Sequence, residues 1–206
     1  MELLDTVFII AVIVFSVIIH EVMHGVAADK LGDPTARYAG RLTLNPIPHL
    51  DLFGSIILPI ICALSPGGFL FGWAKPVPYN PYNLFRAPYW GEAIVAAAGP
   101  ASNLVLALIA GILIRLQIFP DIFPMLMYVV AINISLTLLN LIPVPPLDGS
   151  KILASILPKS LGYDQLRERM EGNPFLGFGL VLILIVLFGS AFGRLVYGIA
   201  GAIAGV

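Results

Sequence analysis

The chain has 206 residues, of which 59% are hydrophobic and 11% are charged, whereas an ordinary soluble domain has about 25% charged residues. A soluble fold could not bury so much apolar surface, so we expect lipid to surround most of the chain. The net charge of −1 offers no basic surface for phosphates, which argues against nucleic acid as a partner. Cys62 is the only cysteine, so an intrachain disulfide and a cysteine-based zinc site are both excluded.

Five apolar runs follow one another along the chain, and each has the roughly 20 residues that a membrane-crossing helix needs. They cover residues 6–28, 52–74, 93–114, 122–147 and 174–193, the last followed by a Gly/Ala-rich tail. The first run lacks a basic n-region and a cleavage site, so we interpret it as a retained span rather than a signal peptide. The second contains Pro59, Pro66 and a Gly-Gly pair, which fits a re-entrant or broken helix as well as a crossing one.

These runs predict an all-α polytopic membrane protein with about five to six membrane segments, folded as one domain over residues 1–206. Residues 37–45 are rich in strand formers and alternate loosely, so we expect a short strand there, beside the first span. Such a strand would need protein or water around it, because lipid cannot satisfy its edges.

The distribution of basic residues predicts the orientation in the membrane. Most of the charge lies in loops 29–51 and 148–173, whereas the N-terminal tail carries only Glu2 and Asp5. Both loops are therefore expected on the cytoplasmic side, with the N-terminus outside. Segment 52–92 must then start and finish on the cytoplasmic side, which requires a re-entrant hairpin or an even number of passes.

A His-Glu-x-x-His pattern ends the first apolar run. His20 and His24 lie one helical turn apart and can bind one metal ion together, while Glu21 is close enough to hold a water at the metal's open position. Three ionisable groups on one turn of a membrane helix are costly unless they pair, bind an ion or do chemistry. The pattern therefore indicates a metal site rather than chance.

A catalytic zinc site usually has three protein ligands and a water, so a third ligand is required. His49, Asp51 and Asp148 are the candidates, and we favour Asp148. It ends a proline-dense stretch and precedes Gly149, so an unwound span could bring its carboxylate inward to the level of the histidines. The alternative is that Asp148 caps a helix starting at Ser150.

Further elements match a known family. Gly99-Pro100-x-x-Asn103 lies in the third run, and the fourth ends in Asn140-x-x-Pro143-x-Pro145-x-Leu147-Asp148-Gly149. With the His-Glu-x-x-His pattern they resemble, in order and over nearly the whole chain, the site-2 protease family of intramembrane zinc metalloproteases. Segments 44–51 and 72–78 resemble its short prokaryotic branch, which indicates a prokaryotic origin.

The resemblance implies one Zn²⁺ per chain, held by His20, His24 and Asp148, with Glu21 as catalytic acid/base and an unwound fourth span. It implies hydrolysis of peptide bonds within or near transmembrane segments of a membrane-spanning protein substrate, trimmed beforehand or cut on a signal. The expected place is the cell membrane, with the active site near the cytoplasmic side. Many members carry a PDZ or CBS domain, for which this chain has no room.

The remaining polar residues have two interpretations each. Asn140 could donate to the oxyanion or form a helix–helix hydrogen bond. Asn103 could bond across helices, which we favour, or approach the substrate. His49 and Asp51 are loop residues at the interface or part of a gate or second metal site. Gly99 is expected to allow close helix packing.

Two other classes of function compete with a protease. A metal transporter would also place His, Glu and Asp among membrane helices. It would need several ion sites along a path through the membrane, whereas this chain gathers its ligand candidates at one depth. A silent regulator of the same fold would not need Glu21.

Overall fold

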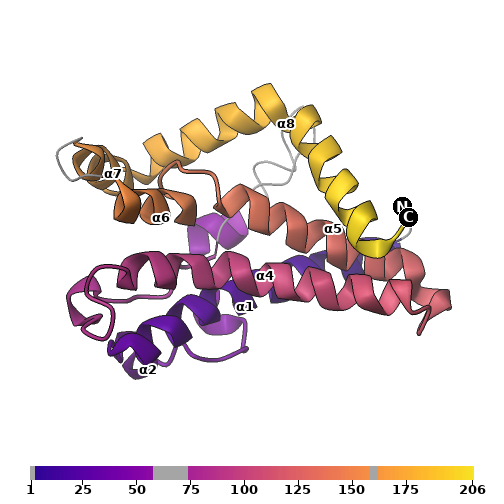
Figure 1. The fold of residues 1–206 in the computed structure, drawn as a ribbon, viewed down its shortest axis with the longest axis horizontal. Coiled ribbons are helices and arrows are strands. Elements are labelled where there is room, and N and C mark those ends of the chain that lie inside the picture. Colours follow the sequence, from indigo (N-terminus) through magenta and orange to yellow (C-terminus); the bar gives the residue numbers. More distant parts are fainter. Residues whose placement is uncertain (1–2, 58–73, 158–161) are drawn as a thin grey trace.

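The computed structural model describes residues 3–57, 74–157 and 162–206. Over these residues the chain forms helices and loops, and no strand (Figure 1). The elements are α1 Leu3–Leu31, α2 Thr35–Tyr38, the short helices η1 Ile47–His49, η2 Leu52–Ile57 and η3 Pro81–Asn83, α4 Gly91–Arg115, η4 Pro120–Ile122, α5 Phe123–Asn140, α6 Asp148–Ile156, α7 Tyr163–Glu171 and α8 Pro174–Ala204.

Four helices are long and apolar enough to cross a membrane. They are α1, α4, the combined η4–α5 segment Pro120–Asn140, and Gly179–Ala204 within α8. The all-α, multi-pass prediction is therefore confirmed. The predicted count of about five to six segments is not reached among the described residues, because most of run 52–74 lies outside them, and so does most of the predicted re-entrant element.

The predicted strand at residues 37–45 is wrong. The Asp33 carboxylate accepts hydrogen bonds from the Thr35 amide (3.3 Å) and hydroxyl (2.5 Å), and this local bonding starts the helical turn α2. Gly40, with a φ of +65°, follows that turn, and the Arg41 amide bonds back to the Ala36 carbonyl at 3.0 Å. These local hydrogen bonds thus override the strand propensity of residues 37–45.

Helix α4 is the centre of the molecule and packs against α1, α5, α6 and α8. Small side chains allow this close packing, as in the buried cluster shared by α4, α5 and α8, which includes Ala107, Ala110 and Ala200. A Cβ on Gly111 would lie 2.3 Å from Ile203 of α8. The prediction that small residues on this helix allow close packing holds at this position.

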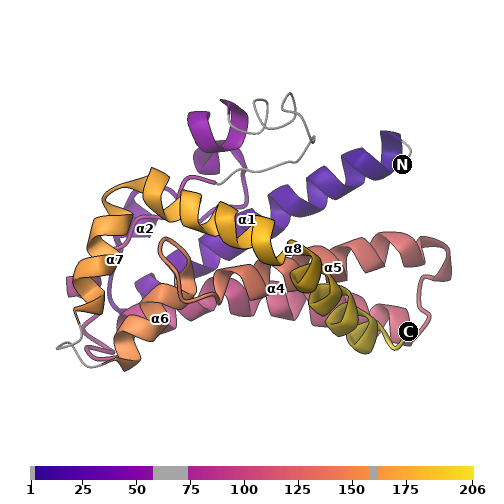
Figure 2. The same cartoon turned by 90° about the horizontal axis from the view of Figure 1, so that it is seen from above.

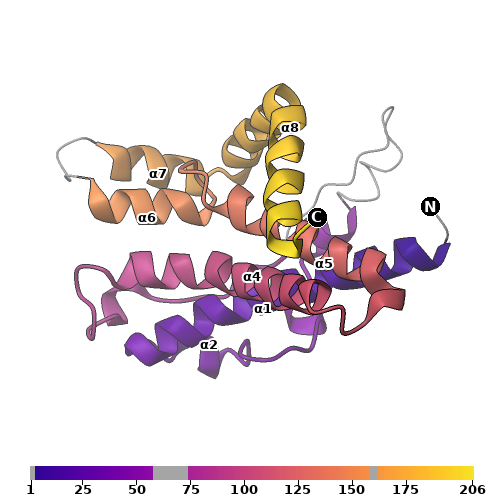
Figure 3. The ribbon, with the colours of Figure 1, turned by 45° about the vertical axis from the view of Figure 1, so that its right-hand side comes forward.

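The fourth apolar run is unwound at its end. Helix α5 stops at Asn140 and α6 starts at Asp148, and the prolines between them prevent a continuous helix. A Cβ on Gly149 would lie 2.3 Å from the Leu141 carbonyl oxygen, so only glycine lets the start of α6 fold back on the end of α5. Helix α6 then lies alongside α4 (Figure 3).

The two basic loops meet at one end of the molecule. Helices α2, α6 and α7 gather there, while the N-terminal end of α1 and the α4–α5 connection lie at the opposite end (Figures 1 and 2). This grouping is the one that the charge pattern predicts.

Candidate metal centre and active site

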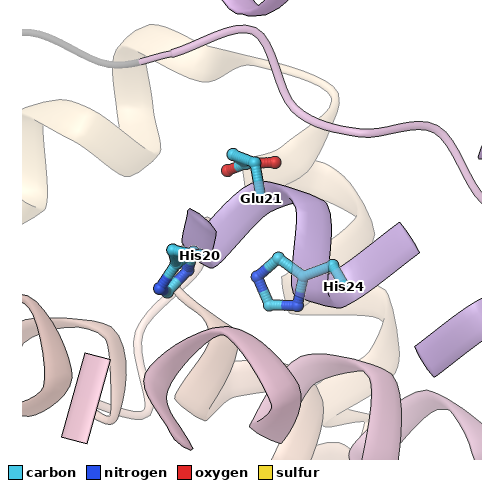
Figure 4. Close-up of side chains that lie close together, drawn as sticks. All are labelled: His20, Glu21 and His24. Atoms are coloured by element: carbon cyan, nitrogen blue, oxygen red, sulfur yellow. The ribbon is translucent and has the colours of Figure 1, made fainter. Parts of the chain in front are cut away.

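His20 and His24 project from one side of α1. Their rings lie side by side below the helix in Figure 4, with Glu21 above it. The ring centroids are 4.7 Å apart and nearly perpendicular, and the two residues are only 5% and 8% exposed. Helix geometry alone produces this pairing, since residues four apart share one face.

Asp148 reaches the same point from another span. Its Oδ2 atom lies 3.1 Å from His20 Nε2 and 3.2 Å from His24 Nε2. The unwound segment and the close fold at Gly149 place α6 so that its first residue faces α1. The structure thus brings together the three residues that the sequence predicts as a ligand set.

The other ring nitrogen of each histidine faces a hydrogen-bond acceptor. His20 Nδ1 donates to Asn103 Oδ1 at 2.6 Å, and His24 Nδ1 donates to the Val95 carbonyl at 2.7 Å. With the proton on Nδ1, a neutral imidazole turns the lone pair of Nε2 toward Asp148. Three electron-pair donors therefore converge on one point, and a cation held between them makes this arrangement favourable.

The donor set fits Zn²⁺. Tetrahedral ligands held about 2.0–2.1 Å from one zinc ion lie about 3.3 Å from each other, close to the two distances from Asp148 Oδ2. Burial acts to raise the pKa of Asp148, but the hydrogen bonds and positive charge that the two histidines offer when protonated outweigh burial and hold that pKa below its usual range. The carboxylate is therefore ionised and ready to bind a cation.

Glu21 lies beside this group. The potential ligand atoms of His20, Glu21 and His24 all lie within 4.8 Å of one another. One carboxylate oxygen of Glu21, Oε2, accepts a hydrogen bond from the Val77 amide at 2.9 Å. Glu21 is thus close to the histidines but held by a different segment of the chain.

The other candidates for the third ligand have different partners. His49 is buried, and its Nε2 donates to the Thr43 carbonyl at 2.9 Å. Asp51 caps η2, since its carboxylate accepts from the Gly54 amide at 2.6 Å. These contacts favour the interpretation of both as loop residues.

A cleft of about 570 Å³ connects these groups. It is lined by the two histidines, Glu21 and Asp148, and also by Asp51, Val77, Tyr79, Asn140 and Lys151. The Asn140 amide donates to the Leu136 carbonyl of its own helix at 3.0 Å, so among the described residues it does not bond across helices. A second cavity of about 520 Å³ lies at the α4–α5 connection, far from these ionisable groups along the bundle.

Sequence reasoning missed how closely α4 supports the site. The Asn103 amide nitrogen donates to Asn133 Oδ1 (2.9 Å) and the Ser16 carbonyl (3.2 Å), which leaves its oxygen for His20. A Cβ on Gly99 would lie 2.5–2.6 Å from both imidazoles. Both residues belong to the Gly-Pro-x-x-Asn element. The prediction that Asn103 bonds across helices is confirmed, but the sequence did not show that one of its partners is His20.

A family model described as Peptidase family M50 matches residues 8–120 and 115–186, most of the chain. The chain belongs to peptidase family M50. This confirms the resemblance to the site-2 proteases.

The chain is also similar to several curated proteins. "Putative zinc metalloprotease YwhC" of Bacillus subtilis is 36% identical over 87% of this chain and 80% of its own length. "Putative zinc metalloprotease Rip2" of Mycolicibacterium smegmatis is 32% identical over 87% of this chain and 67% of its own length. No solved structure matches significantly. As an M50 peptidase with four helices suited to crossing a membrane, the chain is a multi-pass membrane metalloprotease whose cofactor is zinc.

Proposed function

We propose that this M50 peptidase hydrolyses peptide bonds within or near the transmembrane segments of other membrane proteins. The observation that carries the proposal is the convergence of His20 Nε2, His24 Nε2 and Asp148 Oδ2 within a cleft among helices that suit a membrane. We assign these three residues as the ligands of a single zinc ion.

Zinc bound there supplies a Lewis acid that acidifies water and polarises a carbonyl group. Asn103 and the Val95 carbonyl fix the histidine tautomers so that both Nε2 lone pairs point inward. Glu21 acts as the acid/base, because its carboxylate lines the same cleft. It accepts the proton of the attacking water and later returns it to the leaving amine nitrogen.

Asn140 is the candidate donor to the developing oxyanion. It lines the cleft at the end of α5. One of its amide protons bonds to the Leu136 carbonyl, and the second is available for a substrate oxygen.

The substrate is a membrane-spanning segment that must unwind before cleavage, since helical peptide bonds hide their carbonyl groups in intrahelical bonds. The cleft is lined partly by α7, from the end that carries the two basic loops. The positive-inside rule favours a cytoplasmic position for this end, which supports a site toward the cytoplasmic side of the cell membrane. Substrates with helix-weakening residues near the cut should be cleaved faster than variants with leucine there.

The test compares the wild type with Glu21→Gln, both purified in detergent, on a membrane-spanning reporter. We expect zinc in both proteins and cleavage by the wild type alone, with a loss of about 10⁴-fold or more in rate. Equal cleavage by the variant would refute the role of Glu21. Zinc flux into vesicles without cleavage would instead favour a transporter.

A further inference from the structure

An extended segment, Lys75–Val77, runs along the side of α1 that carries Glu21 (Figure 4). The Val77 amide donates to Glu21 Oε2 at 2.9 Å. A hydrogen bond from a backbone amide to a carboxylate is charge-assisted and strong. It fixes one oxygen of Glu21, while the other, Oε1, has no such partner among the residues that the structure describes.

Two residues of the preceding loop hold this segment in place. The Arg41 guanidinium donates to the Lys75 carbonyl at 2.6 Å, and the Lys75 amide donates to the His49 carbonyl at 2.9 Å. Both Arg41 and His49 are buried. The Lys75 peptide unit is therefore anchored on both sides, two residues before the amide that contacts Glu21.

The side chains of Leu42 and Val77 pack closely on α1 at Gly25. A Cβ on Gly25, one turn after Glu21, would lie 2.9 Å from Val77 Cγ1 and 2.6 Å from Leu42 Cδ2. Only glycine at this position lets the Val77 side chain settle against the helix. The amide of Val77 is thereby brought within hydrogen-bond distance of Glu21.

The burial of the Arg41 guanidinium has a high cost in free energy for a residue that only anchors a loop. It is 6% exposed, and its Nε has no hydrogen-bond partner in the described part of the chain, although buried polar groups are normally satisfied. Burial lowers the pKa of Arg41, while the negative charge of Glu21 raises it. Arg41 is linked to Glu21 through the Lys75–Val77 segment: it holds the Lys75 carbonyl, and the Val77 amide contacts the carboxylate.

We propose that Lys75–Val77, anchored by Arg41, is a clamp that orients the Glu21 carboxylate for proton transfer. Val77 and Arg41 are positioning residues: they act on the substrate only through Glu21. The clamp holds Oε2 and leaves Oε1 to exchange the proton. This inference rests on the acid/base role of Glu21 proposed above.

Val77→Pro tests the clamp directly, because it removes the one backbone N–H that contacts Glu21. Position 77 lies between Pro76 and Pro78, and a residue that precedes proline favours the extended region, in which the fixed φ of proline is also allowed. Val77→Ala is the matched control: it keeps the N–H and shortens the side chain. We expect Val77→Pro to lower kcat by about 100-fold with KM and zinc content unchanged, and Val77→Ala, which keeps the N–H, to lose at least about 10-fold less kcat than Val77→Pro.

Arg41→Lys and Arg41→Ala test the anchor. A lysine ammonium can still donate to the Lys75 carbonyl, so we expect Arg41→Lys to recover most of the kcat that Arg41→Ala loses. If Arg41→Ala keeps full kcat, or if Val77→Pro and Val77→Ala behave alike, the clamp is wrong even though Glu21→Gln is inactive.

Amide hydrogen exchange does not depend on cleavage, so it tests the clamp separately from the proposed protease reaction. Amide hydrogen exchange at Val77 should be slow in the wild type and at least 10-fold faster in Glu21→Ala and Arg41→Ala. Equal exchange in all three proteins would overturn the clamp. Slow exchange that depends on Glu21, in a protein that cleaves no reporter, would support the clamp while the proposed reaction fails.

Discussion

The amide of Asn103 fixes which nitrogen of His20 can bind a metal. The Nδ2 atom of Asn103 donates hydrogen bonds to Asn133 Oδ1 and to the Ser16 carbonyl, so Oδ1 is the atom that accepts from His20 Nδ1. Asn133 is committed in turn, since its amide donates to the Val129 carbonyl. Both asparagines are fully buried. A chain of hydrogen bonds across α1, α4 and α5 thus sets one tautomer and one ring orientation.

Replacing Asn103 with leucine should therefore weaken zinc binding. Loss of a partner of this kind typically costs about 10–100-fold in metal affinity. The measurement is a competition titration against a zinc chelator. Ser102→Ala is the control, because Ser102 bonds only to the Gly99 carbonyl of its own helix, and it should leave the affinity within about 2-fold. Equal affinities for Asn103→Leu and wild type would contradict the role of this contact.

Two glycines of α4 allow close contacts with two different neighbours. At Gly99 the missing Cβ makes room for the imidazoles of α1, and at Gly111 it makes room for Ile203 of α8. Pro100 lies inside the helix, next to the glycine that faces the two histidines proposed as metal ligands. The same small-residue pattern therefore shapes the site at one position and the bundle at the other.

Alanine substitutions should separate these two purposes. Gly99→Ala is expected to displace the histidines and abolish stoichiometric zinc binding. Gly111→Ala is expected to lower the thermal unfolding temperature through its clash with Ile203, at a cost of about 1–3 kcal/mol, while keeping zinc. Zinc content and unfolding temperature of both variants give the answer. A Gly99→Ala protein with full zinc content would contradict the account.

The four candidate spans among the described residues share one direction of alignment. The loops around α2 and α7 lie at one end of these helices, and the α4–α5 connection lies at the other (Figure 2). This agrees with the charge distribution of the sequence.

Thiol labelling tests this orientation. In a Cys62→Ser background, single cysteines replace Tyr38, Gln165 and Asp121, of which the first two lie on the basic loops. An impermeant reagent should label positions 38 and 165 only in inside-out vesicles, and position 121 only in right-side-out vesicles. Labelling of 121 from the same side as 165 would contradict the arrangement.

Local features of the sequence were enough for part of this structure. The pairing of His20 with His24 follows from helix periodicity, and the break before Asp148 follows from prolines. Long-range contacts were out of reach: Asn103 lies 83 residues from His20, and Val77 lies 56 from Glu21. No periodicity encodes such contacts. The strand expected at 37–45 failed because local hydrogen bonds, from Thr35 to the Asp33 carboxylate and from the Arg41 amide to the Ala36 carbonyl, form a helical turn there instead.

The most direct test of the metal centre is the zinc content of Asp148→Asn beside that of Asp51→Asn. Both acids line the cleft and were candidates for the third ligand, and both substitutions preserve side-chain shape. We predict one zinc per chain in the wild type and in Asp51→Asn, and a large loss in Asp148→Asn. Full zinc in Asp148→Asn with loss in Asp51→Asn, or no zinc in the folded wild type, would contradict the account.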